Sequence, residues 1–167
     1  MKIPEQTNVT VEGDKVVVKG SAAITLEKKF NPRMLGVTVE GSEVTVKPLV
    51  KKTKRVSAMA GALESHLKNM FKGCRESYEK KLSLVYAHFP VSVEVKGADV
   101  VIKNFLGEKT PRHAKVRGSA KVAVKGQEIT VTGNNKEDVG QTASNIIKAT
   151  RITKRDIRVF QDGIYYA

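Results

Sequence analysis

The chain repeats one pattern of predicted elements twice, and this duplication constrains the fold more than any other feature of the sequence. Residues 36–46 and 121–131 both alternate apolar and polar side chains around a central glycine, Gly41 in the first segment and Gly126 in the second. Such alternation is typical of β-strands with one buried face, and a glycine between two alternating runs marks a tight turn. Each segment is therefore predicted to be a β-hairpin. Valine-rich alternating runs predict a further hairpin before each of them.

After each copy of this hairpin, the apolar residues recur with the period of an α-helix. In the first copy, one helical face is formed by Val56, Met59, Ala60, Leu63, Leu67, Met70, Phe71 and Cys74. In the second copy, the corresponding face is formed by Val139, Ala143, Ile146, Ile147 and Thr150. Asn135 is predicted to cap the second helix, because Glu137 and Asp138 follow it in the first turn, where the helix dipole favours acidic residues.

A strand is expected to close each copy. After the first helix the alternating residues are Leu82, Leu84, Tyr86 and His88, and after the second they are Ile157, Val159, Ile164 and Tyr165. The boundary between the copies is predicted near Phe89 and Pro90. The sequence thus indicates an α+β fold of two tandem similar domains from an internal duplication, residues 1–89 and 90–167. Each domain is expected to be an antiparallel β-sheet with one α-helix packed on it.

The charge of the chain favours a polyanionic partner. There are 30 Lys and Arg residues against 17 Asp and Glu, which gives a formal net charge of +13. Such a field attracts nucleic acid, the commonest polyanion, although an anionic membrane or an acidic polysaccharide could use the same charge. Both halves of the chain carry a basic excess, so the charge alone does not say which half binds.

Three basic segments are the candidate phosphate contacts. The first lies at the start of the first helix and could also be an ordinary solvated charge run. The second is a Gly- and Pro-punctuated stretch, predicted to be a loop, and the third follows the second helix, where some cations simply complement the helix dipole. The candidates are Lys51, Lys52, Lys54 and Arg55; Lys103, Lys109, Arg112, His113, Lys115 and Arg117; and Arg151, Lys154, Arg155, Arg158, Gln161, Tyr165 and Tyr166.

Signatures of catalysis or metal binding are poor. His66, His88 and His113 share no metal-ligand spacing, and the single cysteine, Cys74, excludes an internal disulfide and makes a zinc site improbable. Cys74 continues the apolar stripe of the first helix, so a buried structural thiol is favoured over a nucleophile. No phosphate-binding loop and no carboxylate pair stands out. We therefore expect no enzymatic activity, metal or cofactor, with a nucleic-acid-processing enzyme or a generic polyanion binder as less favoured alternatives.

The predicted strands are rich in Val, Ile, Thr and Lys and poor in aromatic residues. RNA-recognition modules that stack bases on a sheet need clustered strand aromatics, so binding is expected to depend on shape and phosphates more than on stacked bases. No apolar run approaches the roughly 18 residues that span a bilayer, and no signal-peptide pattern follows Met1. A cytoplasmic protein without a membrane partner is expected.

Four segments together resemble the large-subunit ribosomal protein six family in its archaeal form, whose eukaryotic counterpart is called protein nine. Combined with the duplicated layout, they cover essentially the whole chain. The segments are residues 65–73 (Ser-His-Leu-Lys-Asn-Met-Phe-Lys-Gly), 85–90 (Val-Tyr-Ala-His-Phe-Pro), 104–109 (Asn-Phe-Leu-Gly-Glu-Lys) and 156–165 (Asp-Ile-Arg-Val-Phe-Gln-Asp-Gly-Ile-Tyr).

This resemblance implies a structural constituent of the large ribosomal subunit that binds ribosomal RNA (rRNA) near the stalk base and the elongation-factor site. It implies neighbouring large-subunit proteins and nearby translational GTPases as partners, and a monomer within the ribosome. In the family the second domain makes the main rRNA contacts, which here points to residues 103–117 and 151–166. The Gly- and Lys-rich tail of the bacterial branch is missing, and Asp162 with Gly163 is expected to shape a turn instead.

Overall fold

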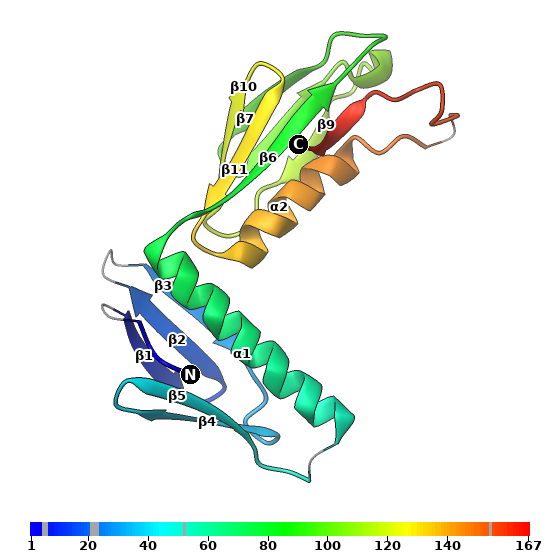
Figure 1. Cartoon of the computed structure of the whole chain (residues 1–167). Helices are drawn as coiled ribbons and strands as arrows, with labels where there is room; N and C mark the ends of the chain where they lie inside the picture. The colour runs from blue at the N-terminus through cyan, green and yellow to red at the C-terminus, as the bar shows by residue number, and fades with distance from the viewer. Residues whose placement is uncertain (5–6, 21–23, 52, 154) are drawn as a thin grey trace. The chain divides into compact units, whose positions relative to one another are not determined.

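A computed structural model of the chain describes residues 1–4, 7–20, 24–51, 53–153 and 155–167. The chain forms two compact units, Met1–Ser77 and Tyr78–Ala167. Each unit contains antiparallel sheets and one long α-helix (Figure 1). The α+β class predicted from the repeated pattern is therefore confirmed.

The first unit contains a three-stranded sheet of order β1-β2-β3 and a separate two-stranded hairpin, β4-β5. Gly13 and Gly41 occupy the two hairpin turns with φ of 59° and 56°, a left-handed conformation that favours glycine. The elements are β1 (Thr7–Glu12), β2 (Lys15–Gly20), β3 (Thr25–Lys29), β4 (Leu35–Glu40), β5 (Glu43–Pro48) and α1 (Lys54–Arg75).

Helix α1 is the helix that the apolar periodicity predicts. The Thr53 side chain caps its N-terminus by accepting a hydrogen bond from the Val56 backbone N–H, 3.3 Å away. The buried face contains Leu67, which is fully buried, and Cys74, and it packs against strand residues such as Val16. Burial raises the pKa of the Cys74 thiol, which favours its protonated form and agrees with a structural role.

The second unit contains a four-stranded sheet of order β10-β11-β6-β12 and a three-stranded sheet, β7-β8-β9. Its core joins both sheets to α2 through apolar side chains such as Ile102, Ile129 and Ile146. Asn135 caps α2 as predicted, because its side chain accepts a hydrogen bond from the Glu137 N–H. The elements are β6 (Tyr78–Val85), β7 (Ser92–Lys96), β8 (Asp99–Lys103), the short 3-10 helix η1 (Phe105–Gly107), β9 (Arg112–Lys115), β10 (Lys121–Lys125), β11 (Glu128–Gly133), α2 (Lys136–Ala149) and β12 (Gly163–Tyr166).

The division of the chain differs from the predicted boundary at Phe89 and Pro90. Strand β6, which the sequence pattern assigned to the first copy, pairs with β11 and β12 and belongs to the second unit. Its Leu82 is fully buried in the core of that unit. Strand pairing joins residues far apart in the chain, so the linear order of the repeat did not reveal it.

Two local predictions were also wrong. Residues 112–115 of the presumed basic loop form strand β9, which pairs with β8. Ile157 and Val159 lie in a turn before β12, 68% and 62% exposed, and not in a strand. Alternation of two apolar residues over so short a stretch is a weak strand signal, and the predicted final strand is confined to β12. Among the described residues, no helix is long and apolar enough to cross a membrane.

Candidate nucleic-acid interface

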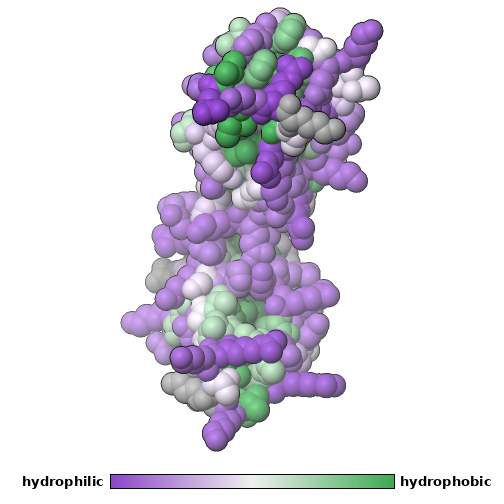
Figure 2. Space-filling view, turned by 90° about the vertical axis from the view of Figure 1, so that its right-hand side faces the viewer, coloured by the Kyte–Doolittle hydropathy of each residue, from purple (hydrophilic) through white to green (hydrophobic). Residues whose placement is uncertain are grey.

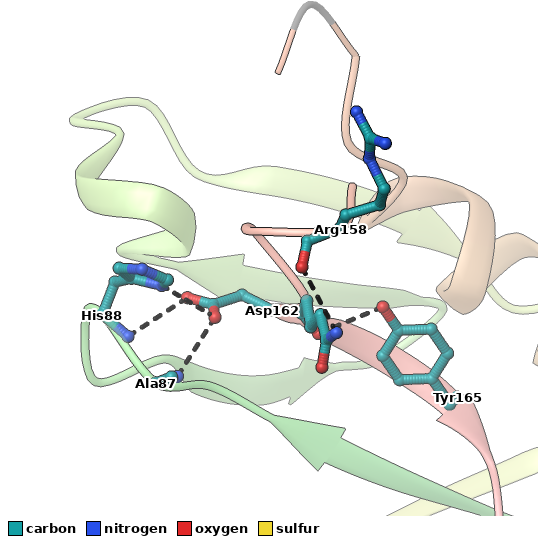
Figure 3. Close-up of polar contacts among 6 residues, drawn as sticks. Ala87, His88, Arg158, Asp162 and Tyr165 are labelled. Atoms are coloured by element: carbon teal, nitrogen blue, oxygen red, sulfur yellow. Dashed lines mark hydrogen bonds and ion pairs between the residues drawn. The ribbon is translucent and has the colours of Figure 1, made fainter. Parts of the chain in front are cut away.

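Asp162 fastens the segment that follows β6 to the segment that precedes β12 (Figure 3). Its carboxylate, only 1% exposed, accepts hydrogen bonds from the backbone N–H groups of Ala87 and His88, at 3.1 and 3.4 Å, and lies 3.1 Å from His88 Nδ1. Burial alone would raise the pKa of this carboxyl. The contacts with His88 and the two backbone N–H groups outweigh that effect and hold the pKa below its ordinary value. Asp162 is thus an internal anchor, consistent with the turn-shaping role expected for it.

His88 and Arg155 both lie close to the Phe160 ring. The centroids of the His88 and Phe160 rings are 5.0 Å apart with an interplanar angle of 31°. The Arg155 guanidinium carbon lies 4.9 Å from the Phe160 centroid, within the range of a cation–π contact. The side chain of His88 is 37% exposed and Arg155 is exposed. A group of three planar side chains therefore reaches the surface of the second unit.

The segment around η1 is also connected to the segment that follows β6. Asn104, held in a left-handed conformation with φ of 58°, donates a hydrogen bond from Nδ2 to the Pro90 carbonyl oxygen at 2.9 Å. Gly107 also has a positive φ, and a Cβ at this position would lie 3.3 Å from the Phe89 ring. Residues 85–90, 104–109 and 156–165, three of the four segments that carry the family resemblance, therefore meet at one place in the second unit.

Arg112 is engaged inside the protein. It makes two hydrogen bonds to the Glu108 carboxylate, at 2.6 and 2.8 Å, and donates to the carbonyl oxygens of Ala149 and Arg151. Its guanidinium also lies 4.5 Å from the centroid of the Phe105 ring. The Arg112 hydrogen bonds hold the pKa of Glu108 below its usual value, and the charge of Arg155 acts in the same direction. Sequence reasoning named Arg112 as a phosphate contact, whereas the structure gives its guanidinium four internal acceptor contacts.

The Arg112 contacts join two of the predicted basic segments at one point. Arg112 belongs to β9 and donates to the carbonyl oxygens of Ala149, at the end of α2, and of Arg151, so β9 lies beside the start of residues 151–166. Asn145 of α2 strengthens this arrangement by donating from Nδ2 to the Lys115 carbonyl oxygen at 2.9 Å. Thr150 adds a link to β12, because its buried hydroxyl oxygen accepts from the Ile164 N–H at 3.1 Å.

The candidate cations of the second unit divide into paired and unpaired groups. Lys103 lies 2.6 Å from Glu94, Arg117 lies 3.8 Å from Asp138, and Arg158 lies 3.0 Å from Asp156. In the part of the chain that the structure describes, no ion pair engages the exposed side chains of Lys109, His113, Lys115, Arg151 and Arg155. The donors of this second group are therefore exposed and engaged in no ion pair among the described residues.

Gln161 and Tyr165 contact each other at the start of β12 (Figure 3). The Tyr165 hydroxyl donates to the Gln161 carbonyl oxygen at 3.1 Å, and Gln161 Nε2 lies 3.5 Å from the Arg158 carbonyl oxygen. Tyr165 is 48% exposed, and the Tyr166 ring lies under the Lys80 ammonium group. Lys154 lies outside the described residues.

A groove of about 530 Å³ runs beside the C-terminal end of α2. Ile152, Ile157 and Phe160 contribute apolar lining, while Lys148 and Arg151 contribute cations. Figure 2 views the side of the second unit that carries α2 and the segment leading to β12, and shows hydrophobic side chains gathered among hydrophilic ones. The surface near the unpaired cations is therefore mixed in character and not uniformly charged.

The first unit holds the remaining candidates. Lys51, Lys54 and Arg55 are exposed at the start of α1, whose first turn contains no acidic residue. Lys52 lies outside the described residues. Over the described ranges, no group of three or more His, Cys, Asp or Glu side chains is arranged to hold a metal ion.

Sequence reasoning missed the roles of Glu108, Phe160 and the His88–Asp162 pair. The sequence pattern predicts a strand position for His88 and a turn-shaping role for Asp162. Their contacts join positions 74 residues apart in the chain, so spacing carried no signal. The one available signal was that all four residues lie within the segments that carry the family resemblance.

Comparisons with known proteins identify one family. The family model described as "Ribosomal protein L6" matches residues 89–163, which include η1, α2, strands β7 to β11 and Asp162. The "Large ribosomal subunit protein uL6" of Methanococcus vannielii is 47% identical over 99% of this chain and 90% of its own length. The protein of the same name from Methanosarcina mazei is also 47% identical, over 99% of this chain and 93% of its own length. A third, from Natronomonas pharaonis, is 42% identical over 99% of this chain and 92% of its own length.

The matches extend across both units and place the chain among archaeal sequences, as the four segments and the duplicated layout suggested. The chain belongs to the large-subunit ribosomal protein L6 family, in its archaeal form.

Proposed function

We propose that this protein binds large-subunit rRNA near the stalk base and the elongation-factor site, as a structural, non-catalytic constituent of the ribosome. Family membership supports the ribosomal role, and the resemblance supports the location. In this role the protein acts as a monomer within the subunit. Its further partners are neighbouring large-subunit proteins, with translational GTPases close by.

One observation carries the choice of surface. The contacts of Arg112 and Asn145 hold β9 against α2, so that unpaired cations from two separate segments lie on one framework. Lys109, His113 and Lys115 come from the first segment, and Arg151 and Arg155 from the second. His113 and Lys115 belong to β9 itself, and a cation held on a rigid element loses less entropy on binding phosphate than a cation on a free loop. The second unit is accordingly the main rRNA-binding domain.

The remaining candidates take smaller roles in this proposal. Lys103, Arg117 and Arg158 contact phosphate in competition with the carboxylates with which they form ion pairs. Arg112 acts indirectly, because it holds β9 against the end of α2. Gln161, Tyr165 and Tyr166 contribute polar contacts at the edge of β12. Lys154 provides a further phosphate contact. The first-unit group, Lys51, Lys52, Lys54 and Arg55, provides an accessory contact with the rRNA.

Co-sedimentation tests the proposal. The full-length chain is expected to migrate with the large subunit in a density gradient at physiological salt, and to remain there when the subunit is washed. Binding to isolated large-subunit rRNA is expected to weaken steeply with salt, by about 0.9 in the slope of log K for each phosphate neutralised on a duplex. A protein that stays at the top of the gradient contradicts the proposal.

Variants identify the surface. Lys115→Ala and Arg151→Ala are each expected to lower rRNA affinity and to reduce the salt slope by about one. Lys125→Ala is the matched control, because Lys125 is an exposed lysine on β10, outside the proposed surface. Equal effects of Lys125→Ala and Lys115→Ala would show that net charge, and not this surface, determines binding.

A further inference from the structure

In the rRNA interface described so far, Arg155 serves only as a phosphate contact, and its neighbours His88 and Phe160 have no role. The sequence predicted binding through shape and phosphates, because its strands lack aromatic residues. The structure brings planar side chains together by a different route, since His88 and Phe160 come from two loops and not from the face of a sheet. Tyr86 and Phe89, 37% and 43% exposed, flank His88 on the same segment.

A buried group holds this arrangement in place. The Asp162 carboxylate fixes the His88 backbone and lies 3.1 Å from the His88 ring nitrogen, although the ring itself reaches solvent. Phe160 is two residues from Asp162, and the centroid of its ring lies 5.0 Å from that of the His88 ring. The orientation of both rings is therefore set before any partner arrives, which reduces the entropy lost on binding.

The group includes an exposed guanidinium plane. The Arg155 guanidinium carbon lies 4.9 Å from the Phe160 ring centroid, and the Arg155 side chain is exposed. No carboxylate in the described ranges forms an ion pair with it, although the charge of Glu108 is near enough for Arg155 to lower the Glu108 pKa. Guanidinium planes and aromatic faces are the surfaces on which proteins stack unpaired bases of RNA.

The space beside the group suits a nucleotide. Phe160 contributes to the groove of about 530 Å³ that also contains Ile152 and Ile157, so a base would meet planar and apolar surface there. Arg151 and Lys148, which line the same groove, are placed to meet the phosphate of that nucleotide or of its neighbour.

We propose that the His88–Phe160–Arg155 group is a stacking platform for one unpaired base of the rRNA. This inference rests on the proposed function and adds a mode of contact that the sequence did not predict. Stacking on the face of a base adds affinity for the rRNA. It also limits binding to rRNA sites at which one base is unpaired and can turn out of its helix.

Chemical probing of rRNA flexibility tests this inference. Acylation of 2′-hydroxyl groups is measured nucleotide by nucleotide on large-subunit rRNA carrying the full-length protein. The wild-type chain is expected to protect one unpaired nucleotide, or two adjacent ones, and Phe160→Leu and Arg155→Ala are expected to restore their reactivity. Affinity for the rRNA is expected to fall at least about fivefold in each variant, the lower end of the effect of losing one base stack.

Two further variants serve as controls. Phe160→Tyr keeps a planar ring and is expected to keep the protection, whereas Lys125→Ala removes a distant exposed lysine and is expected to change nothing at this nucleotide. Arg155→Ala alters an exposed side chain, so it reports on stacking even where Phe160→Leu disturbs the fold, and the melting temperature of each variant shows which case applies.

The outcomes separate the two proposals. Wild-type protein that fails to bind large-subunit rRNA overturns the proposed function and the platform together. Wild-type protein that binds, with the same acylation pattern in Phe160→Leu and Arg155→Ala as in the wild type, overturns the platform alone. Loss of protection spread evenly over many nucleotides in Arg155→Ala also overturns it, because that pattern belongs to a phosphate contact.

Discussion

At the scale of single residues, the cations that support the fold are distinguished from those available to a partner by their exposure and their internal hydrogen bonds, and not by their charge. Arg112 and Lys109 are three positions apart and were equal candidates from sequence, yet Arg112 binds a carboxylate and two backbone carbonyl oxygens while Lys109 is exposed. An arginine with several internal acceptors stabilises the fold, and a lysine in water is available to a partner. The two residues should therefore respond differently to substitution.

Arg112→Ala is expected to lower the free energy of unfolding of the second unit by about 2 kcal/mol. The substitution removes the hydrogen bonds of a charged donor and leaves the Glu108 carboxylate and two backbone carbonyl oxygens without that partner. Lys109→Ala is expected to stay within about 0.5 kcal/mol of the wild type, as is usual for exposed sites. Chemical denaturation measures both. Equal stability of the two variants would contradict a structural role for Arg112.

Asp162 predicts a specific acid sensitivity. A carboxyl whose pKa is depressed in the folded state stabilises the protein above its unfolded pKa, about 3.9, and loses this contribution as pH falls through the folded value. The wild-type second unit should therefore lose stability below about pH 4. Asp162→Asn should be less stable near neutral pH and should show a smaller decrease over the acid range. If the free energies of unfolding of the wild type and of Asp162→Asn ran parallel between pH 6 and pH 2, Asp162 would be excluded as the source of the acid sensitivity.

At the scale of elements, helix α1 shows how strongly an apolar stripe specifies packing. Leu67 is fully buried at the centre of that stripe, between residues such as Leu63 and Phe71. Leu67→Ala is expected to cost about 2–5 kcal/mol in the first unit, since it removes the leucine side chain beyond Cβ and leaves a cavity. Hydrogen exchange of α1 amides measures the loss locally. Lys68→Ala, on the exposed side of the helix, should leave exchange nearly unchanged.

The elements also show which predictions a sequence supports. The α1 and α2 helices and the hairpins at Gly41 and Gly126 follow from local periodicity and turn residues, and all were predicted. The assignment of β6 and the strand β9 depend on pairing with distant strands, which periodicity does not encode. The candidate site followed the same rule, because composition identified the basic segments but not the internal bonds that engage Arg112.

At the scale of the whole molecule, the division after Ser77 predicts which fragment folds. A fragment of residues 78–167 contains every strand of the β10-β11-β6-β12 sheet, whereas a fragment beginning at Pro90 lacks β6, the strand between β11 and β12. The longer fragment should melt cooperatively and bind rRNA, and the shorter one should not fold. Calorimetry and the dispersion of amide resonances distinguish them. A folded 90–167 fragment would restore the boundary expected from the sequence.

The central position of β6 also sets an order of events during synthesis. β6 is the first strand of its unit to leave the ribosome that makes it, but its partners β11 and β12 begin at Glu128 and Gly163. The first unit has all its strands and its helix as soon as Arg75 has emerged, and can fold at once. β6 must wait with both edges unpaired while more than half of the second unit is translated. A nascent chain stalled before Gly163 therefore exposes a strand edge that the finished protein covers, and a chain stalled before Glu128 exposes both edges of β6 and is more open to misassembly.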